Sequence, residues 1–190
     1  TQYTSSAASD VYKRQVSTGG NAINVAQVFM NTNLAATGGV VATLLTSLIK
    51  TGKMDITMAM NGAIAGLVAI TAGPSAPSGG EAVIIGAVGG VIVYFSILFF
   101  ERTLKVDDPV GAISAHGTVG IYGVMVVPLT SDATFGAQLL GVVLIAGFTY
   151  VMSLLTIYVI NFFMPIRASE TEQEVGLDLT ETGVEAYPDF

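Results

Sequence analysis

The sequence contains no cysteine and only one histidine among its 190 residues. Without cysteine there can be no disulfide framework, no thiol nucleophile and no thiolate metal site. With a single histidine as well, the sequence predicts no protein-bound zinc, and nothing in it indicates a cofactor. Charged residues are also scarce, at 11% of the chain against about 25% in ordinary soluble domains. This scarcity argues against a soluble protein.

Two functional classes are disfavoured by what the chain lacks. The seven Lys and Arg residues are scattered, so there is no basic patch to support nucleic-acid binding. No nucleophile is paired with a base, and one histidine without an assignable carboxylate partner is thin support for acid–base catalysis. Asp107 and Asp108 could be imagined as a catalytic pair, but a helix cap is the stronger interpretation. We therefore expect neither an enzyme nor a nucleic-acid-binding protein.

The chain is rich in apolar sequence instead. Hydrophobic residues make up 52% of it, the mean hydropathy is +0.68, and several long runs contain no charge. Uncharged runs of this length are typical of transmembrane helices. We therefore predict an all-α fold. Residues 21–164 are expected to form a polytopic transmembrane helix bundle that lies in the lipid bilayer. Its five spans are expected at about residues 22–49, 56–73, 82–100, 109–129 and 134–163.

The two ends of the chain differ from this apolar domain. Residues 1–20 lack the hydrophobic core of a signal peptide, and we interpret them as a disordered leader that is not native to the gene. Residues 165–190 contain seven acidic side chains against one arginine, Arg167. This composition predicts an acidic tail that is exposed to water.

The basic residues indicate how the spans are oriented. They follow the first, third and fifth spans and are missing after the second and fourth. Because Lys and Arg accumulate in cytoplasmic loops, those three segments, and hence the C-terminus, are predicted to be cytoplasmic in a multi-pass protein of the plasma membrane. The residues concerned are Lys50, Lys53, Arg102, Lys105 and Arg167.

The only histidine lies in an apolar segment just after an acidic stretch. Asp107, Asp108 and Pro109 predict a helix cap at the cytoplasmic mouth, because an Asp side chain accepts from free backbone N–H groups and Pro suits the first helical position. His116 then lies about two turns into a helix that runs uncharged to about Leu129. In a soluble core such a histidine would bond to a neighbouring carbonyl. In a membrane an ionisable residue marks a pathway, which we favour here.

Other polar and small residues in the spans are interpreted as packing elements. Amides at membrane depth need partners, since hydrocarbon supplies none, so Asn31, Asn33 and Asn61 are expected to hydrogen-bond between helices rather than bind a ligand. Gly62 and Gly66 are four residues apart, share one helix face and permit close helix approach.

Four motifs occur in a fixed order along the chain. They are Asn31-Thr32-Asn33-Leu34-Ala35, then Asn61-Gly62-Ala63-Ile64-Ala65-Gly66-Leu67-Val68, then Asp107-Asp108-Pro109 with His116-Gly117, and finally Gly176-Leu177-Asp178 with Glu185-Ala186-Tyr187. Any one of these motifs would be weak evidence for a family. The four together, in this order and spacing, resemble the ammonium transporter family, the Amt, Mep and Rh group. The similarity covers about residue 20 to the end of the chain.

The resemblance implies an eleven-helix fold, a homotrimer, and a pore in each subunit that conducts ammonium or ammonia. The five spans would be the last five helices, and His116 would be the second of the family's two pore histidines. Ala112 and Thr71 fall at positions expected to line or border that pore. The acidic tail resembles the family's cytoplasmic C-terminal region, which couples subunits and can meet a PII-type regulatory protein.

The chain also departs from the family pattern. The first pore histidine and the aromatic residues of the outer mouth belong to earlier helices that are absent here, and Thr182 precedes Gly183 where many relatives have histidine. We therefore interpret the chain as a C-terminal fragment of the transporter and expect no transport by it alone. The alternatives are an ammonium sensor that signals through its cytoplasmic tail and an inactive structural membrane fragment.

Overall fold

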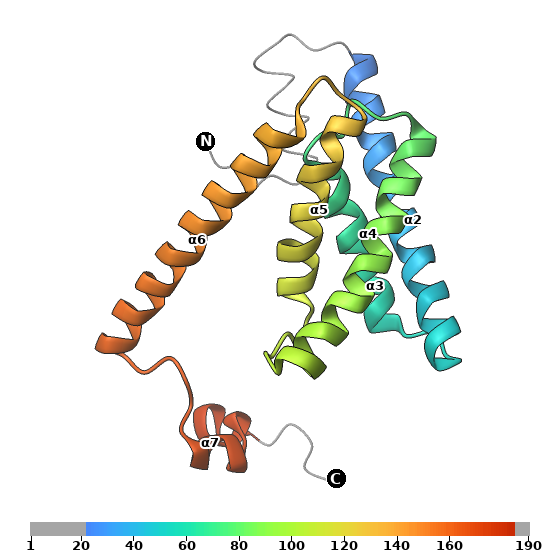
Figure 1. Ribbon diagram of the computed structural model, residues 1–190. Coiled ribbons are helices and arrows are strands. Elements are labelled where there is room, and N and C mark those ends of the chain that lie inside the picture. Colours follow the sequence, from blue (N-terminus) through green and yellow to red (C-terminus); the bar gives the residue numbers. More distant parts are fainter. Residues whose placement is uncertain (1–21, 185–190) are drawn as a thin grey trace. The chain divides into compact units, whose positions relative to one another are not determined.

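The computed structural model describes residues 22–184, with side chains from residue 25 onward. The predicted leader at 1–20 lies outside this range, as do residues 185–190 of the tail. All regular structure in the described range is helical (Figure 1). The elements are the α-helices α2 (Ala22–Thr51), α3 (Ile56–Thr71), α4 (Gly79–Leu98), α5 (Val119–Val126), α6 (Phe135–Phe163) and α7 (Glu170–Val175), the π-helical segments η1 (Phe99–Leu104), η2 (Ile113–Thr118) and η4 (Asp178–Thr182), and the 3-10 turn η3 (Val127–Leu129).

The chain divides into two compact units, Thr1–Val142 and Val143–Phe190, with the division inside α6. In the first unit α2, α3 and α4 pack against one another, and η2 with α5 packs on α3 and α4 (Figure 1). The second unit contains the rest of α6 and the short helices α7 and η4.

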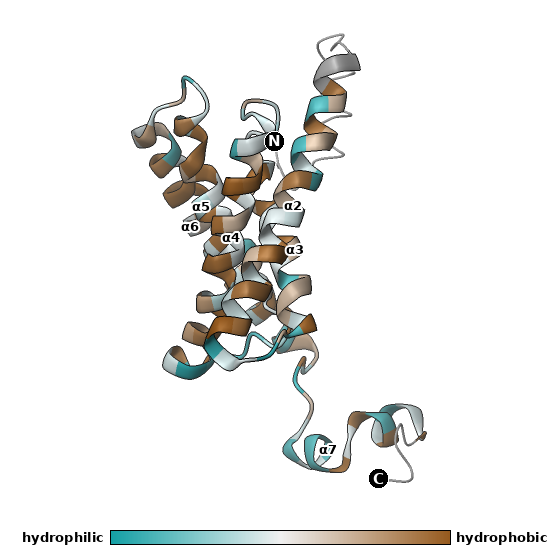
Figure 2. Ribbon diagram, turned by 90° about the vertical axis from the view of Figure 1, so that its right-hand side faces the viewer, coloured by the Kyte–Doolittle hydropathy of each residue, from teal (hydrophilic) through white to brown (hydrophobic). Residues whose placement is uncertain are grey.

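Three helical stretches are long and apolar enough to cross a membrane: Val25–Thr51, Gly79–Leu104 and Phe135–Phe163. Two further apolar stretches, Ile56–Thr71 and Ile113–Leu129, are shorter. Figure 2 shows hydrophobic residues along these helices and hydrophilic ones in α7. The all-helical, membrane-type architecture is therefore as predicted, while a topology of five crossings stays a prediction.

Local sequence explains where α3 and α4 begin. Asp55 is the N-cap of α3, and its Oδ1 atom accepts from the backbone N–H groups of Thr57 and Met58 at 2.8 and 3.2 Å. Ser78 and Glu81 form a reciprocal capping box at the start of α4. Such caps satisfy backbone donors that a helix leaves unpaired.

Small residues allow α2, α3 and α4 to approach closely. A Cβ atom added to Gly66 or to Gly86 would overlap the carbonyl oxygen of Ala35 on α2. The buried hydroxyl of Thr43 donates to the carbonyl oxygens of Gly39 and Gly90, at 2.8 and 2.9 Å, and so connects α2 to α4. Gly62 faces the same threonine. The small-residue spacing read from the sequence thus corresponds to backbone-to-backbone packing.

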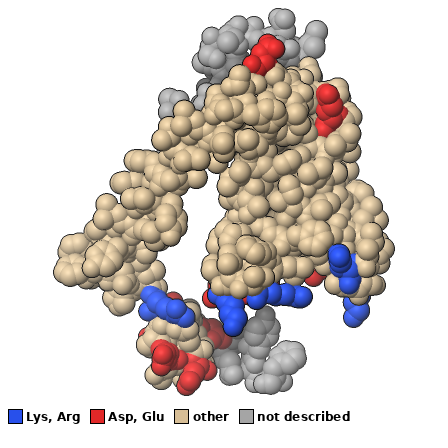
Figure 3. All heavy atoms as spheres, viewed as in Figure 1, with Lys and Arg blue, Asp and Glu red and all other residues tan. Residues whose placement is uncertain are grey.

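Charged side chains distinguish the two ends of the first unit. Lys50, Lys53, Arg102 and Lys105 lie at the end where α2 and α4 finish (Figure 3). Glu81 lies at the opposite end, where α4 begins. These four basic side chains therefore share one end of the bundle. This arrangement supports the prediction that the loops after α2 and α4 lie on the cytoplasmic side.

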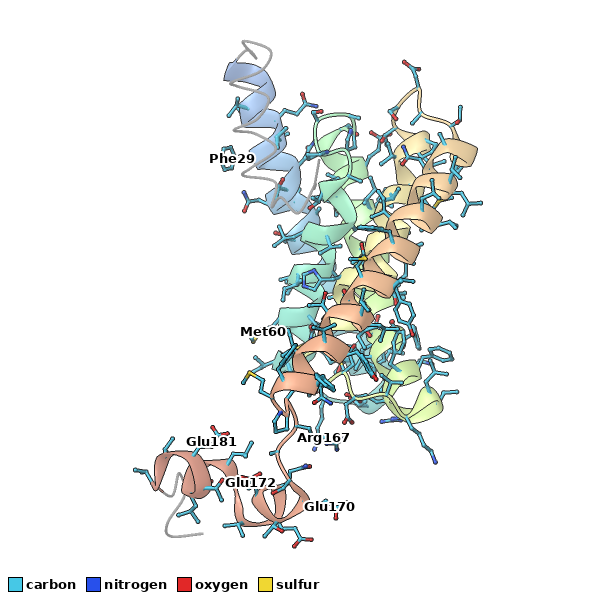
Figure 4. All side chains as sticks on the ribbon, turned by 90° about the vertical axis from the view of Figure 1, so that its left-hand side faces the viewer. Phe29, Met60, Arg167, Glu170, Glu172 and Glu181 are labelled. Carbon is cyan, nitrogen blue, oxygen red and sulfur yellow. The ribbon has the colours of Figure 1, made fainter. Side chains whose placement is uncertain are left out.

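Large apolar side chains remain exposed on the outer faces of the helices. Phe29 on α2 is 50% exposed and Met60 on α3 is 62% exposed, and both project outward (Figure 4). Helix α6 has no buried residue in any of its 29 positions. Faces of this kind suit lipid or further protein rather than water.

Candidate pore site

Asp108 organises the start of the helical segment that contains His116. Its Oδ1 atom accepts from Ile113 N at 2.9 Å, and its Oδ2 atom accepts from Ser114 N at 3.0 Å and from Ser114 Oγ at 2.8 Å. Burial raises the pKa of Asp108, but the hydrogen bonds from Ile113 and Ser114 lower it by more, so this pKa lies below its usual range. Asp108 is therefore a buried, ionised carboxylate with a structural partner for each oxygen.

The helix begins four residues later than the sequence predicts. Pro109–Gly111 form a turn in which Gly111 N donates to Asp108 O at 2.9 Å, and η2 starts at Ile113. Gly111 has a φ of 70°, a left-handed conformation that favours glycine. A Cβ atom there would also lie 2.6 Å from Asn61 Oδ1. An Asp-Pro-x-Gly sequence is a turn signal that could have revealed this arrangement.

The later start changes the position of the histidine. His116 lies in the first turn of η2, one turn rather than two from the helix start. Asp107 is exposed, and Asp108 rather than an Asp-Pro pair supplies the cap through its side chain. The Pro109 ring precedes the helix and does not occupy its first position.

His116 and Ala112 lie on the side of this segment that faces away from the bundle core. Both are exposed, whereas Ser114 and Ala115 between them are buried where η2 packs on α3 and α4. The imidazole thus has a small neighbour four residues earlier and an open approach. A neutral imidazole offers one donor and one acceptor nitrogen to a solute on this face.

Thr71 lies at a different depth from His116. Thr71 ends α3, is partly buried, and donates its hydroxyl to the carbonyl oxygen of Leu67. The α5 residue that packs on the end of α3 is Gly123, where a Cβ atom would come within 2.8 Å of Ala69 O. Gly123 follows His116 by seven residues, which is about 10 Å of helix. The structure therefore does not bring Thr71 and His116 together.

Asn31 holds the loop between α3 and α4. It is fully buried, and its Nδ2 atom donates to Pro74 O at 2.9 Å and to Pro77 O at 2.7 Å. Gln27, one turn earlier, donates to Ser75 O at 3.3 Å and was not singled out by the sequence. The loop follows Thr71 directly, so these amides fix the chain next to one of the predicted pore positions.

The other two amides hydrogen-bond within their own helices. Asn33 is exposed and donates to Phe29 O at 2.9 Å. Asn61 donates to Thr57 O at 3.2 Å and contacts the Gly111 turn through its side-chain oxygen. The expectation of hydrogen bonds between helices therefore fails for Asn33 and for Asn61, since the printed bond of each amide goes to the carbonyl four residues earlier in its own helix.

The second unit presents an acidic helix. Ser169 caps α7, its backbone N–H and hydroxyl both donate to Glu172 Oε2 at 2.7 Å, and Glu170 lies in the same turn (Figure 4). The hydrogen bonds from the side chain and backbone of Ser169 lower the pKa of Glu172 below its usual range.

Among residues 25–184, no group of three or more His, Cys, Asp or Glu could hold a metal ion.

Comparison with known proteins places this helical membrane chain in a family. A model of the Ammonium Transporter Family matches residues 14–187. The ammonium transporter of Bacillus subtilis (strain 168) is 32% identical over an alignment of 177 residues, which covers 85% of this chain and 44% of that protein. Ammonium transporter Amt2 of Archaeoglobus fulgidus is 32% identical over an alignment of 190 residues, which covers 88% of this chain and 40% of that protein.

Solved structures agree with the sequence relatives. One described as Sensor Amt Protein has a TM-score of 0.79 and 28% identity, covering 85% of this chain and 43% of that chain. Candida albicans Mep2 has a TM-score of 0.73 and 27% identity, covering 82% of this chain and 39% of that chain. The chain belongs to the ammonium transporter family, as its motifs predict. It spans about two fifths of the length of these relatives.

Proposed function

We propose that this chain contributes the last five helices of an eleven-helix plasma-membrane transporter for ammonium or ammonia. The observation on which the proposal rests is the family match over residues 14–187 together with relatives named as ammonium transporters. The five apolar helical stretches and the shared basic end of the bundle support a multi-pass arrangement with a cytoplasmic C-terminus. The other helices of that fold, including the one with the other pore histidine, would come from sequence that this chain does not contain.

Transport would separate the proton from ammonia. A bare cation at bilayer depth costs on the order of 2.5–3.5 kcal/mol by insertion scales. Ammonium can avoid this cost by losing a proton, whereas potassium has no proton to lose, so deprotonation also gives selectivity. Ammonia would then pass His116, whose two ring nitrogens can donate or accept a hydrogen bond and relay a proton, and would regain a proton inside. The exposed face shared by His116 and Ala112 supports this role.

Thr71 would act at a separate position in the pore. Thr71 ends α3, the helix end on which Gly123 packs, and Gly123 lies about two helical turns beyond His116, which suits a residue that borders the path nearer the outer mouth. Homotrimer formation and contact between the acidic tail and a PII-type regulator complete the proposal, and both are carried over from the family.

An ammonium sensor is a second candidate. It is favoured by the solved relative described as Sensor Amt Protein and by the separate acidic helix α7. Deleting residues 165–190 would abolish signalling and spare uptake if the tail is the output of a sensor. An inactive structural membrane fragment is the remaining alternative.

The test of the transport proposal is the variant His116→Ala in the transporter that contains this chain. We expect methylammonium uptake to fall by at least tenfold, or potassium to begin to compete, because the proton relay is lost. Ile145→Ala, on the exposed face of α6, is the matched control and should leave uptake unchanged. Unchanged uptake and unchanged potassium rejection in His116→Ala would refute the role of this histidine.

A further inference from the structure

The turn that carries His116 contains one residue more than a turn of α-helix. Val119 N donates to Ser114 O, five residues earlier, whereas an α-helix pairs residues four apart. Such π-helical turns are rare and occur mostly as single turns within α-helices, frequently at functional sites. Because successive residues of an α-helix point about 100° apart, loss of the extra residue would turn the His116 side chain by about that angle relative to one end of the segment.

Both ends of this π-helical turn are fixed. At its start Asp108 accepts from the backbone N–H groups of Ile113 and Ser114. Beyond its end a Cβ atom on Gly123 would come within 2.8 Å of Ala69 O, so α5 packs too closely on α3 to rotate freely. The extra residue therefore lies between two fixed points, and contacts of the turn itself decide how it is accommodated.

One hydrogen bond between side chains ties the end of the turn to α4. Ser96 Oγ donates to Thr118 Oγ at 2.9 Å. Thr118 is the last residue of η2, and Ser96, on α4, is 7% exposed. The other described side chains that line the surface beside this pair are apolar, so none of them can replace either hydroxyl. They are Val91, Ile92, Phe95, Phe99 and Phe100.

The threonines of α2 show how this bond differs from that of an ordinary helical threonine. Each donates its hydroxyl to the carbonyl oxygen four residues earlier in the same helix. They are Thr32, Thr37, Thr43, Thr46 and Thr51. For Thr118 that oxygen would be Ser114 O, which in the π-helical turn accepts from Val119 N. The Thr118 hydroxyl lies against Ser96 instead, so the pair belongs to the π-helical register.

We propose that Ser96 is a positioning residue for His116. Through Thr118 it holds the π-helical turn on α4 and keeps the imidazole on the exposed face that it shares with Ala112. Without this bond the turn relaxes toward an α-helical register, and the ring turns toward the side of Ala115, which is 1% exposed. The inference rests on the proposed conduction role of His116 and adds the residue that sets the direction of its ring.

The single histidine of the chain allows a direct test. With isotope-labelled histidine in the full chain in detergent, the imidazole signal of a nuclear magnetic resonance spectrum belongs to His116 alone. Ser96→Ala and Thr118→Val should shift or split this signal, and the double variant should shift it no further, since either change removes the same bond. Thr118→Ser keeps a hydroxyl and should retain the wild-type signal. Thr46→Val, which removes a hydroxyl bonded within α2, is the matched control and should retain it too.

The second measurement is methylammonium uptake by the transporter that contains this chain. Ser96→Ala should lower the maximal rate roughly tenfold, within the loss of about 100-fold that a misplacement of about 1 Å can cause. KM should stay unchanged, because the change lies at the histidine and not where ammonium enters. Thr118→Ser and Thr46→Val should both transport at the wild-type rate.

An unchanged imidazole signal in folded Ser96→Ala or Thr118→Val would overturn the proposal, and so would shifts that add in the double variant. If Ser96→Ala leaves uptake unchanged while His116→Ala lowers it, the conduction role of the histidine stands and the positioning role is wrong. If neither variant lowers uptake, the conduction role itself is refuted, and the imidazole signal still decides whether Ser96 orients the ring. Circular dichroism of each variant establishes that it is folded.

Discussion

Asn31 and Asn33 are identical side chains on one helix, but they differ in burial and in hydrogen-bond partners. Asn31 is buried and donates to two carbonyl oxygens of the α3–α4 loop, whereas Asn33 is exposed and donates only to its own helix. The Oδ1 atom of Asn31 is buried without a hydrogen-bond partner among the described residues. The sequence predicted that these amides need partners, but a motif of neighbouring letters does not reveal which residue faces a loop.

We expect Asn31→Leu to destabilise the protein by about 1–3 kcal/mol, because two buried loop carbonyls lose their donor. Asn33→Leu should change stability by less than about 0.5 kcal/mol, since it removes one exposed bond within the helix. Thermal unfolding of both variants in detergent, followed by circular dichroism, measures the difference. Equal melting temperatures for the two variants would show that the loop is not held by Asn31.

At the scale of single helices, the apolar runs predicted the elements well and their starts less well. Helix α3 begins at Ile56 and α6 ends at Phe163, as expected from the ends of the runs. The helix with His116 begins late, because Gly111 favours a turn with positive φ over a helical first turn. The position of Thr71 relative to His116 depends on how α3 and α5 are offset, which no single-helix pattern contains.

Close packing of α2, α3 and α4 predicts that a glycine-to-alanine substitution destabilises the protein at the helix contacts and stabilises it where the helix surface is open. Gly66→Ala should destabilise the bundle by about 1–3 kcal/mol, because the new methyl group would overlap Ala35 O and push the helices apart. Gly141→Ala on α6 has open space around it and should stabilise its helix by about 0.5–1 kcal/mol. Chemical unfolding of the two variants measures both changes. A stabilising Gly66→Ala would contradict the observed packing.

At the scale of the whole molecule, composition and motif order predicted an all-helical membrane protein of the ammonium transporter family, and the family match confirms it. The pore could be predicted only through the resemblance, because its walls come from several helices and this chain spans about two fifths of its relatives. The structure adds which side of the η2 segment could line a pore. Ala112 and His116 are exposed on one side, and Ser114 and Ala115 are buried on the other.

The most direct measurement uses the absence of cysteine, since each introduced thiol would be the only one in this chain. Ala112→Cys and Ala115→Cys would be made in the transporter that contains the chain, embedded in lipid vesicles and treated with a small charged thiol reagent. Ile145→Cys on α6 is the control, at an apolar position that we expect to face lipid.

If Ala112 and His116 line a water-filled path, the thiol at 112 reacts and methylammonium slows its reaction, while the thiols at 115 and 145 stay unmodified. Ala115 is 1% exposed and Ile145 is 69% exposed, so reaction follows the path and not simple exposure in the isolated chain. If the thiol at 112 is as unreactive as the one at 145, that face meets lipid or protein, and the proposed role of His116 in conduction is wrong.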